Sequence, residues 1–213
     1  MNNINSIIFD FGGVLVDWSP RYMYKDVFEN NSEMELFLTQ ICSEDWNLQQ
    51  DKGRRLSEGT RVLQDKFPEH RTNIQLYYDQ WEKMLKSDIP ENVAILPQLK
   101  LKYKLYGLTN WSAETFPVAL KRFSFFKYFD GIVVSGEEKM VKPDEDIFYL
   151  ILKRYNLRAG NCLFIDDNLN NINTAKRLGF STIHLQEKTD LKTELSLLGI
   201  LYDHPASGFL TQS

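Results

Sequence analysis

Carboxylates follow two separate apolar runs of this sequence and are the first candidates for chemistry. Asp10 follows residues 7–9, and Asp166 and Asp167 follow residues 161–165. A carboxylate at the end of a buried strand can act as a nucleophile, as a metal ligand or as both. Carboxylates that converge repel one another unless a cation lies between them. Because all of these ligands are oxygens, Mg²⁺ is the natural ion, and it would also take an oxygen of a substrate phosphate.

Three further polar residues complete the set of candidates. Thr109 and Asn110 end another strand-like run, and Lys142 precedes Pro143 in a loop. Because proline keeps the preceding residue extended, we expect Lys142 to project from a fixed loop. Lys142, the Thr109 hydroxyl and the Asn110 amide would then hold the remaining phosphate oxygens. Each pattern alone is common at turns, and only their order and spacing together indicate a site.

These residues share one site only if their strands share one edge of a sheet. Apolar runs alternate with helical patterns after residue 96, which indicates parallel strands covered by helices. The fold class predicted is therefore α/β, a Rossmann-like parallel sheet with helices on both faces. Open sheets of this class bind ligands at the carboxyl ends of the strands. The predicted strands are 7–9, 103–108, 131–135, 161–165 and 180–185, and the helices after residue 96 are 113–123, 146–155, 168–178 and 191–198.

The pattern between the first strand and residue 90 is helical instead. Apolar residues recur there at helical spacing, and Ser32 is placed as an N-cap. The helical spans are 33–41, 57–67 and 72–85, and a polar loop is predicted at 49–55. We therefore predict a core domain of residues 1–16 and 91–213. Residues 17–90 form an inserted all-helical cap domain, which would lie over the sheet edge.

Composition narrows the classes of partner and compartment. The 213 residues, 43% hydrophobic and 25% charged, are those of an ordinary globular protein. A net charge of −4 without long Lys/Arg runs argues against nucleic acid or an anionic membrane as the main partner. No apolar run reaches the ~20 residues of a membrane span. We expect a cytoplasmic monomer or homodimer, in which Cys42 and Cys162 are buried thiols, although a disulfide is not excluded.

The whole sequence resembles the haloacid dehalogenase-like (HAD) hydrolase superfamily. Four motifs carry the resemblance: residues 9–15, 108–110, 142–143, and 164–168 with 171–172. The helical insert resembles the small (C1) cap that many members carry after the first motif. The resemblance implies that Asp10 is a nucleophile that forms an aspartyl-phosphate, which water then hydrolyses. It also implies Mg²⁺ held by Asp10, the carbonyl of Gly12 and the acids Asp166 and Asp167, with Asp167 as the direct ligand.

Gly12 departs from the pattern of the family's phosphatases. They usually carry a second Asp at this position, which protonates the leaving group and then activates water, although some branches have glycine there. General acid–base help is worth roughly 10²–10⁴-fold in rate, or about 3–5 kcal/mol. A residue of the insert could substitute, unless all of them are simply solvated. The candidates for that role are Asp45, Asp51 and Glu58, and those for holding an anionic or sugar-like substrate are Lys52 and Arg54.

Three functions are compatible with these residues. The first is a Mg²⁺-dependent phosphatase of a small phosphorylated metabolite, with sugar phosphates among the candidates. The second is a 2-haloacid dehalogenase, whose chemistry needs no metal and whose resembling enzymes have a largely neutral fourth motif. The third is a phosphate- or metal-binding protein without turnover. Asp166 and Asp167 favour the first function, because only a cation relieves their mutual repulsion.

Overall fold

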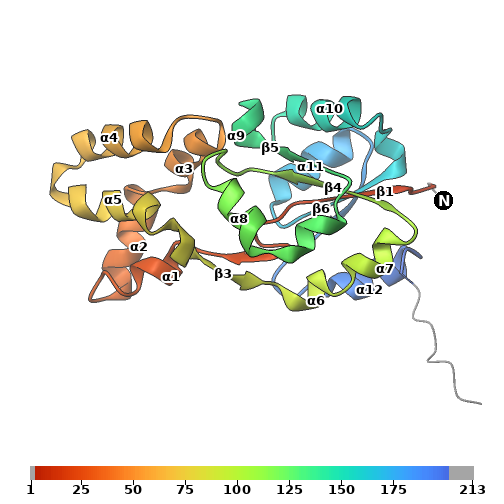
Figure 1. The fold of residues 1–213 in the computed structure, drawn as a ribbon, viewed down its shortest axis with the longest axis horizontal. Coiled ribbons are helices and arrows are strands. Elements are labelled where there is room, and N and C mark those ends of the chain that lie inside the picture. Colours follow the sequence, from red (N-terminus) through yellow and green to blue (C-terminus); the bar gives the residue numbers. More distant parts are fainter. Residues whose placement is uncertain (1–2, 202–213) are drawn as a thin grey trace, which may run out of the picture.

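The centre of the molecule is a five-stranded parallel sheet with the order β5-β4-β1-β6-β7. A computed structural model describes residues 3–201 of the chain. Figure 1 shows the sheet edge-on with helices on both sides. The strands are β1 (Ser6–Phe9), β4 (Lys104–Thr109), β5 (Gly131–Val134), β6 (Cys162–Asp166) and β7 (Ser181–His184). The predicted α/β class is confirmed.

Both faces of the sheet are buried, so its strands need no polar alternation. Ile7 and Phe9 of β1 point to one core cluster and Ile8 to the other, and all three are fully buried. The first face is covered by α7 (Leu96–Lys100), α8 (Phe116–Arg122) and α12 (Leu191–Leu197), and the second by α10 (Glu145–Arg154) and α11 (Leu169–Arg177). Gly179 follows α11 with φ +90°, a left-handed conformation that glycine adopts readily at the end of a helix.

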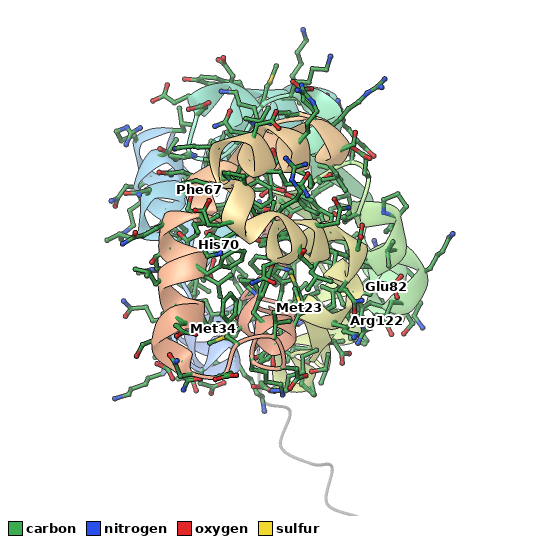
Figure 2. The ribbon with its side chains drawn as sticks, turned by 90° about the vertical axis from the view of Figure 1, so that its left-hand side faces the viewer. Met23, Met34, Phe67, His70, Glu82 and Arg122 are labelled. Atoms are coloured by element: carbon green, nitrogen blue, oxygen red, sulfur yellow. The ribbon has the colours of Figure 1, made fainter. Side chains whose placement is uncertain are left out.

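Five helices lie together beyond one end of the sheet (Figure 1). They are α1 (Arg21–Tyr24), α2 (Asn31–Gln40), α3 (Glu44–Asp51), α4 (Leu56–Lys66) and α5 (Arg71–Asp79). Their own core is rich in aromatic side chains, with Tyr24, Phe37 and Tyr77 almost completely buried. Met23 and Met34 are buried there too (Figure 2). We call these five helices the insert.

Two strands outside the main sheet join the insert to it. They are β2 (Val16–Trp18) and β3 (Leu85–Asp88), which pair antiparallel. Arg122 of α8 donates hydrogen bonds to the carbonyls of Glu82, at 3.2 Å, and Lys86, at 2.9 Å (Figure 2). These bonds attach the two-stranded β2–β3 ribbon to a helix that covers the main sheet. The insert is therefore anchored at both of its chain crossings.

Short elements complete the described chain. They are α6 (Pro90–Val93) and α9 (Ser135–Glu138) with the 3₁₀ helices η1 (Pro68–His70), η2 (Trp81–Met84), η3 (Ser124–Tyr128) and η4 (Ala159–Asn161). Cys42 and Cys162 are both buried and unpaired, as expected. Within residues 3–201, none of the helices has the length and apolar character that crossing a membrane requires.

One of the helices predicted in the insert is shorter than expected. The helix predicted over 72–85 ends at Asp79, and η2 and β3 follow it. Trp81 and Leu85 have helical spacing in the sequence, but Leu85 pairs with Trp18 in the β2–β3 ribbon. This tertiary pairing overrides the local periodicity.

The end of α3 and the beginning of α2 also differ from the prediction. Residues 49–51, predicted as loop, are the last turn of α3, which the Ser43 side chain caps by accepting from the Trp46 N–H. Its sequence is so polar that it carries little apolar periodicity, and only Trp46 and Gln50 are buried. Helix α2 begins at Asn31, two residues before the predicted start, because the side chain of Asn30 rather than that of Ser32 caps it by accepting from the Glu33 N–H at 2.9 Å.

Candidate active site

Three carboxylates converge at the carboxyl edge of the central strands. Asp10 follows β1, Asp166 ends β6 and Asp167 comes next. One oxygen from each lies within 4.8 Å of the others. The Asp10 N–H continues the pairing of β1 with β6 by donating to the Ile165 carbonyl at 2.9 Å. The parallel ladder therefore sets the distance between these acids.

Lys142 enters this group from the loop after α9. Its side chain is fully buried, and its Nζ lies 3.0 Å from Asp10 Oδ2 and 2.7 Å from Asp166 Oδ2. Burial opposes the charged form of Lys142, but the two carboxylates outweigh it and raise its pKa. Lys142 is therefore an ammonium that bridges the nucleophile candidate and the acid beside it.

Asn110 and Thr109 lie at the end of the neighbouring strand β4, but their side chains are used differently. Asn110 Nδ2 donates to the Lys142 carbonyl at 2.9 Å, and Asn110 Oδ1 accepts from the Lys142 N–H at 2.8 Å. This amide therefore holds the lysine loop rather than pointing both of its polar atoms toward a ligand. Thr109 is almost completely buried, and its hydroxyl makes no hydrogen bond to another residue of the described chain.

Asp166 is the most firmly held of the three acids. Besides Lys142, it accepts from the Asn168 N–H at 2.8 Å and from Asn171 Nδ2 at 3.0 Å on both oxygens. Asn168 also caps α11 by accepting from the Asn170 N–H at 2.9 Å. Asp166 has no exposed surface, whereas Asp167 is exposed. Of the two, Asp167 is therefore the freer to change its partner.

The charges of this cluster do not balance. Three carboxylates and one ammonium leave a net charge of −2 when all are ionised. Burial raises the pKa of Asp10 to about 7, and Asp166 and Asp167 add to this shift while Lys142 opposes it. An oxygen-only group with this charge and spacing fits a divalent cation such as Mg²⁺.

The two glycines after Asp10 have different reasons to be glycine. Gly13 has φ +69°, and a Cβ there would collide with the Asp167 carboxylate. At Gly12 the backbone is ordinary, and a Cβ would have no heavy atom within 4 Å. Gly13 therefore permits a close approach that the cluster needs. Gly12 instead leaves open space where a side chain would fit.

That space belongs to a cavity of about 90 Å³ between the sheet edge and the insert. Four aromatic side chains, several polar groups and the backbone of Gly12 form its wall. The lining residues are Asp10, Gly12, Trp18, Asn47, Asp51, Tyr78, Trp81, Asn110, Trp111, Ser112 and Thr115. The Nε1 atom of Trp18 is buried without a hydrogen-bond partner in the described chain. A small ligand bound next to Asp10 would therefore meet aromatic faces and free polar groups.

Of the three acids proposed from the insert, one reaches this cavity. Asp51, the last residue of α3, lines it together with Asp10. Asp45 and Glu58 are exposed. Asp45 lines a wider cleft alongside, to which Asp167 also contributes. The structure therefore brings Asp51 to the site and leaves Glu58 outside it.

The two basic candidates of the insert are bonded elsewhere. Arg54 donates to Gln50 Oε1 at 2.6 Å and to the Trp46 carbonyl at 3.3 Å. Lys52 forms an exposed ion pair of 3.5 Å with Asp144. Neither lines the cavity beside Asp10. Their side chains stabilise the insert and its contact with the loop before α10.

The aromatic wall and Ser135 are parts of the site that the sequence did not reveal. The β2–β3 ribbon brings Trp18 and Trp81 together with Trp111. Of the three, only Trp111 could be placed near the site from the sequence, because it follows Asn110. Ser135 begins α9, and its hydroxyl accepts from the Trp111 N–H at 2.8 Å. These positions depend on contacts between distant segments, which local patterns do not report.

Comparison with known proteins identifies the family of the chain. The family model described as haloacid dehalogenase-like hydrolase matches residues 4–179. The chain belongs to this family. It is 28% identical to the sesquiterpene phosphatase astK of Aspergillus oryzae, over 90% of this chain and 94% of that protein. It is 24% identical to the D-ribitol-5-phosphate phosphatase of Bacteroides thetaiotaomicron, over 92% and 98%. The predicted family and hydrolase class are thereby confirmed.

A solved structure agrees with the fold. A HAD family enzyme from Bacteroides thetaiotaomicron, in a magnesium complex, superposes with a TM-score of 0.71. The two chains are 23% identical, and the match covers 91% of this chain and 98% of that one. At this identity the likeness establishes the α/β fold that places the carboxylates, and it leaves the substrate open.

Proposed function

We propose that this protein is a Mg²⁺-dependent phosphatase of a small phosphorylated metabolite, with Asp10 as its nucleophile. The observation that carries the proposal is the Lys142 ammonium, which bonds Asp10 and Asp166 while Asp167 lies within 4.8 Å. Membership of a hydrolase family supports it, as do two relatives named as phosphatases. In this proposal residues 17–90 act as a cap domain over a core domain of residues 1–16 and 91–213.

The metal would be held by Asp10, Asp167 and the backbone carbonyl of Gly12. Asp166, with its oxygens already bonded to Lys142 and Asn171, would support the ligands and serve as an alternate one. The net charge of −2 and the pKa of Asp10 near 7 support this assignment, because both would be relieved by a divalent cation. When bound, Mg²⁺ supplies neutralisation of the charge on the transferring phosphoryl group.

Asp10 would carry out the first chemical step. One of its carboxylate oxygens forms a bond to phosphorus as the bond between phosphorus and the ester oxygen breaks, which leaves an aspartyl-phosphate. Water then forms a new bond to phosphorus, and the Asp10–phosphorus bond breaks to release inorganic phosphate. Lys142, 3.0 Å from Asp10, would orient the nucleophile and hold a phosphoryl oxygen. The Thr109 hydroxyl is available for another, and Asn110 would act through the lysine loop that it holds.

The aromatic cavity favours a small leaving group. Its 90 Å³ would take a compact group rather than a protein side chain on its loop. Tyr78, Trp81 and Trp111 offer flat faces, while Trp18 Nε1 and the Ser112 hydroxyl offer hydrogen bonds at the same wall. A sugar or polyol phosphate has both apolar C–H faces and hydroxyls, and it therefore suits this wall.

The paired acids also favour phosphate hydrolysis over halide displacement. A 2-haloacid dehalogenase would use Asp10 without a metal and would gain nothing from a second and third carboxylate beside it. Two ionised neighbours would raise the free energy of a bound haloacid carboxylate, because like charges repel in a buried site. The third reading, a binding protein without turnover, is separated from the first by measurement alone.

Hydrolysis of p-nitrophenyl phosphate tests the proposal. We expect turnover in millimolar Mg²⁺ and its loss when a chelator is added, because nitrophenolate leaves with little need for protonation. Absence of turnover with Mg²⁺ would refute the phosphatase assignment, and turnover that survives the chelator would refute the role of the metal. Chloride release from 2-chloropropionate would establish the dehalogenase instead.

A further inference from the structure

A carboxylate of the insert faces the cavity in which the leaving group would lie. We infer that Asp51 is the proton donor to the leaving group and the proton acceptor from the attacking water, in place of the side chain that Gly12 lacks. This inference rests on the proposed phosphatase function. It assigns to helix α3 a catalytic residue that the motifs of the sheet edge do not contain.

The position of Asp51 is the first argument. It lines the 90 Å³ cavity together with Asp10 and Gly12. It also lines the wider cleft to which Asp167 contributes. The open space at Gly12, with no heavy atom within 4 Å of a Cβ, adjoins the same cavity. An acid at residue 12 and the acid at residue 51 would thus both reach the same cavity, one from the sheet edge and one from the insert.

The end of α3 is held in place by the main sheet. The Asp51 carbonyl accepts from Ser135 Oγ at 2.5 Å, and this same hydroxyl accepts from the Trp111 N–H at 2.8 Å. The Asp51 side chain is oriented by Asn47 Nδ2, which donates to Oδ2 at 3.0 Å. Asn47 is in turn fixed by the Tyr78 hydroxyl, which donates to its Oδ1 at 2.9 Å. This is the support that a positioned proton donor needs.

The charges around Asp51 allow both protonation states near neutral pH. Burial raises its pKa to about 7, and Asp10 adds to this shift while the Ser112 backbone opposes it. Tyr77 and Tyr78 of α5 also face it, and burial raises their pKa values, so that they stay neutral. No Lys, Arg or His between residues 3 and 201 forms an ion pair with it. A general acid that becomes a general base needs this balance.

The two proton transfers complete the reaction of Asp10. As the ester bond to phosphorus breaks, the leaving oxygen takes the proton of the Asp51 carboxyl group and departs as a neutral alcohol. The Asp51 carboxylate then takes a proton from the water whose oxygen bonds to the phosphorus of the aspartyl-phosphate. Inorganic phosphate leaves, and both carboxyl groups return to their starting states.

The test compares three phosphate esters of similar shape, namely p-nitrophenyl, phenyl and benzyl phosphate, with Asp51→Asn. Their leaving oxygens need protonation to increasing degrees. We expect a loss of about 10²-fold or more in kcat/KM for benzyl phosphate. For p-nitrophenyl phosphate we expect a rapid burst of nitrophenolate followed by slow turnover, because the aspartyl-phosphate still forms but hydrolyses slowly. In the wild type, kcat/KM for benzyl phosphate falls above pH ~7, and this fall disappears in the variant.

Two further variants make the result decisive. Glu58→Gln, at an exposed acid of the insert that lies outside the cavity, should change none of the three rates by more than about twofold. Gly12→Asp in the Asp51→Asn background should restore benzyl phosphate turnover at least tenfold, because the space at residue 12 is open. An equal loss on all three esters without a burst, or a wild-type-like Asp51→Asn, would overturn the inference. A wild type that hydrolyses none of the esters would instead refute the phosphatase, and this inference with it.

Discussion

The sheet edge and the insert both line the cavity beside Asp10, but they are held together by different means. At the sheet edge, Asp10 and Asp166 are joined to Lys142 and carried by paired strands. On the insert, Asp51 has neutral partners, and its position depends on one hydroxyl of α9. The first region is fixed by the ladder of the sheet, whereas the second depends on how two segments pack. In the proposed mechanism, the nucleophile therefore lies on the side held by the sheet, and the proton donor lies on the side held by packing between segments.

The largest difference between the two regions should come from the nucleophile. Asp10→Asn replaces the nucleophilic carboxylate with a neutral amide, so kcat should fall by roughly 10⁴-fold or more with every ester. Asp51→Asn, by contrast, should spare the nitrophenolate burst. Rapid-mixing absorbance of p-nitrophenyl phosphate measures both. A burst that survives in Asp10→Asn would place the nucleophile elsewhere.

Removing the buried ammonium of Lys142 should cause the next largest effect, a loss of stability. Lys142→Met leaves Asp10 and Asp166 buried without their counter-charge, which should lower the free energy of unfolding by about 3–5 kcal/mol at pH 8 without metal. Lys86→Met is the matched control, because Lys86 forms an exposed pair with Asp17 and its loss should leave the free energy of unfolding almost unchanged. Urea unfolding gives both values. Equal losses would mean that the cluster does not depend on its lysine.

The exposed acid of the sheet edge should govern metal affinity. Asp167→Asn should weaken Mg²⁺ binding by roughly 10–100-fold while leaving the fold intact, because its side chain is exposed. Titration calorimetry with Mg²⁺ measures the change. Asp144→Asn, in an exposed pair with Lys52, is the control. Unchanged affinity in Asp167→Asn would remove this residue from the ligands.

The contributions of the two regions to stability should change with pH in the same direction, but only that of the sheet edge should change when Mg²⁺ binds. The pKa values of Asp10 and Asp51 are raised to about 7, so the folded state binds their protons more tightly than the unfolded chain does. The free energy of unfolding of the metal-free protein should therefore fall by roughly 1–3 kcal/mol between pH 5 and 8. Bound Mg²⁺ should remove the pH dependence of stability that is due to Asp10 and leave the pH dependence that is due to Asp51. The Asp51→Asn substitution should remove the latter. A stability that rises over this range would contradict both shifts.

The smallest effect concerns the contact between the two regions. Ser135→Ala removes the hydroxyl that bonds the Asp51 carbonyl, which should cost about 1 kcal/mol in unfolding free energy. Turnover of benzyl phosphate should fall a few-fold, while the nitrophenolate burst is unchanged. Ser196→Ala, whose hydroxyl bonds only the Lys192 carbonyl of its own helix, is the control. A loss of the burst in Ser135→Ala would show that the contact supports Asp10 as well.

The sheet and its carboxylates could be predicted because their signals are local. Each apolar run is long enough to define a strand, and the residue after it must lie at the carboxyl edge. Asp10, Asp166 and Asp167 therefore meet where the sequence places them. The insert gave weaker signals. Helix α3 is polar, and β2 and β3 are strands only because they pair with each other.

Side-chain partners were the least predictable feature. Asn110 was expected to hold phosphate, but it bonds the backbone of Lys142, a contact 32 positions along the chain. Asp51 was one of three equal candidates, and only the packing of α3 against Ser135 separates it from Asp45. Such choices depend on tertiary contacts, which the spacing of residues in the sequence does not contain.

The direct test of the central claim is the mass of the protein after acid quenching during turnover. With Mg²⁺ and p-nitrophenyl phosphate, we predict one added phosphoryl group, mapped by peptide sequencing to Asp10 and more abundant in Asp51→Asn. It should be absent with a chelator and in Asp10→Asn. A nitrophenolate burst without this adduct, or an adduct on any residue other than Asp10, would contradict the account.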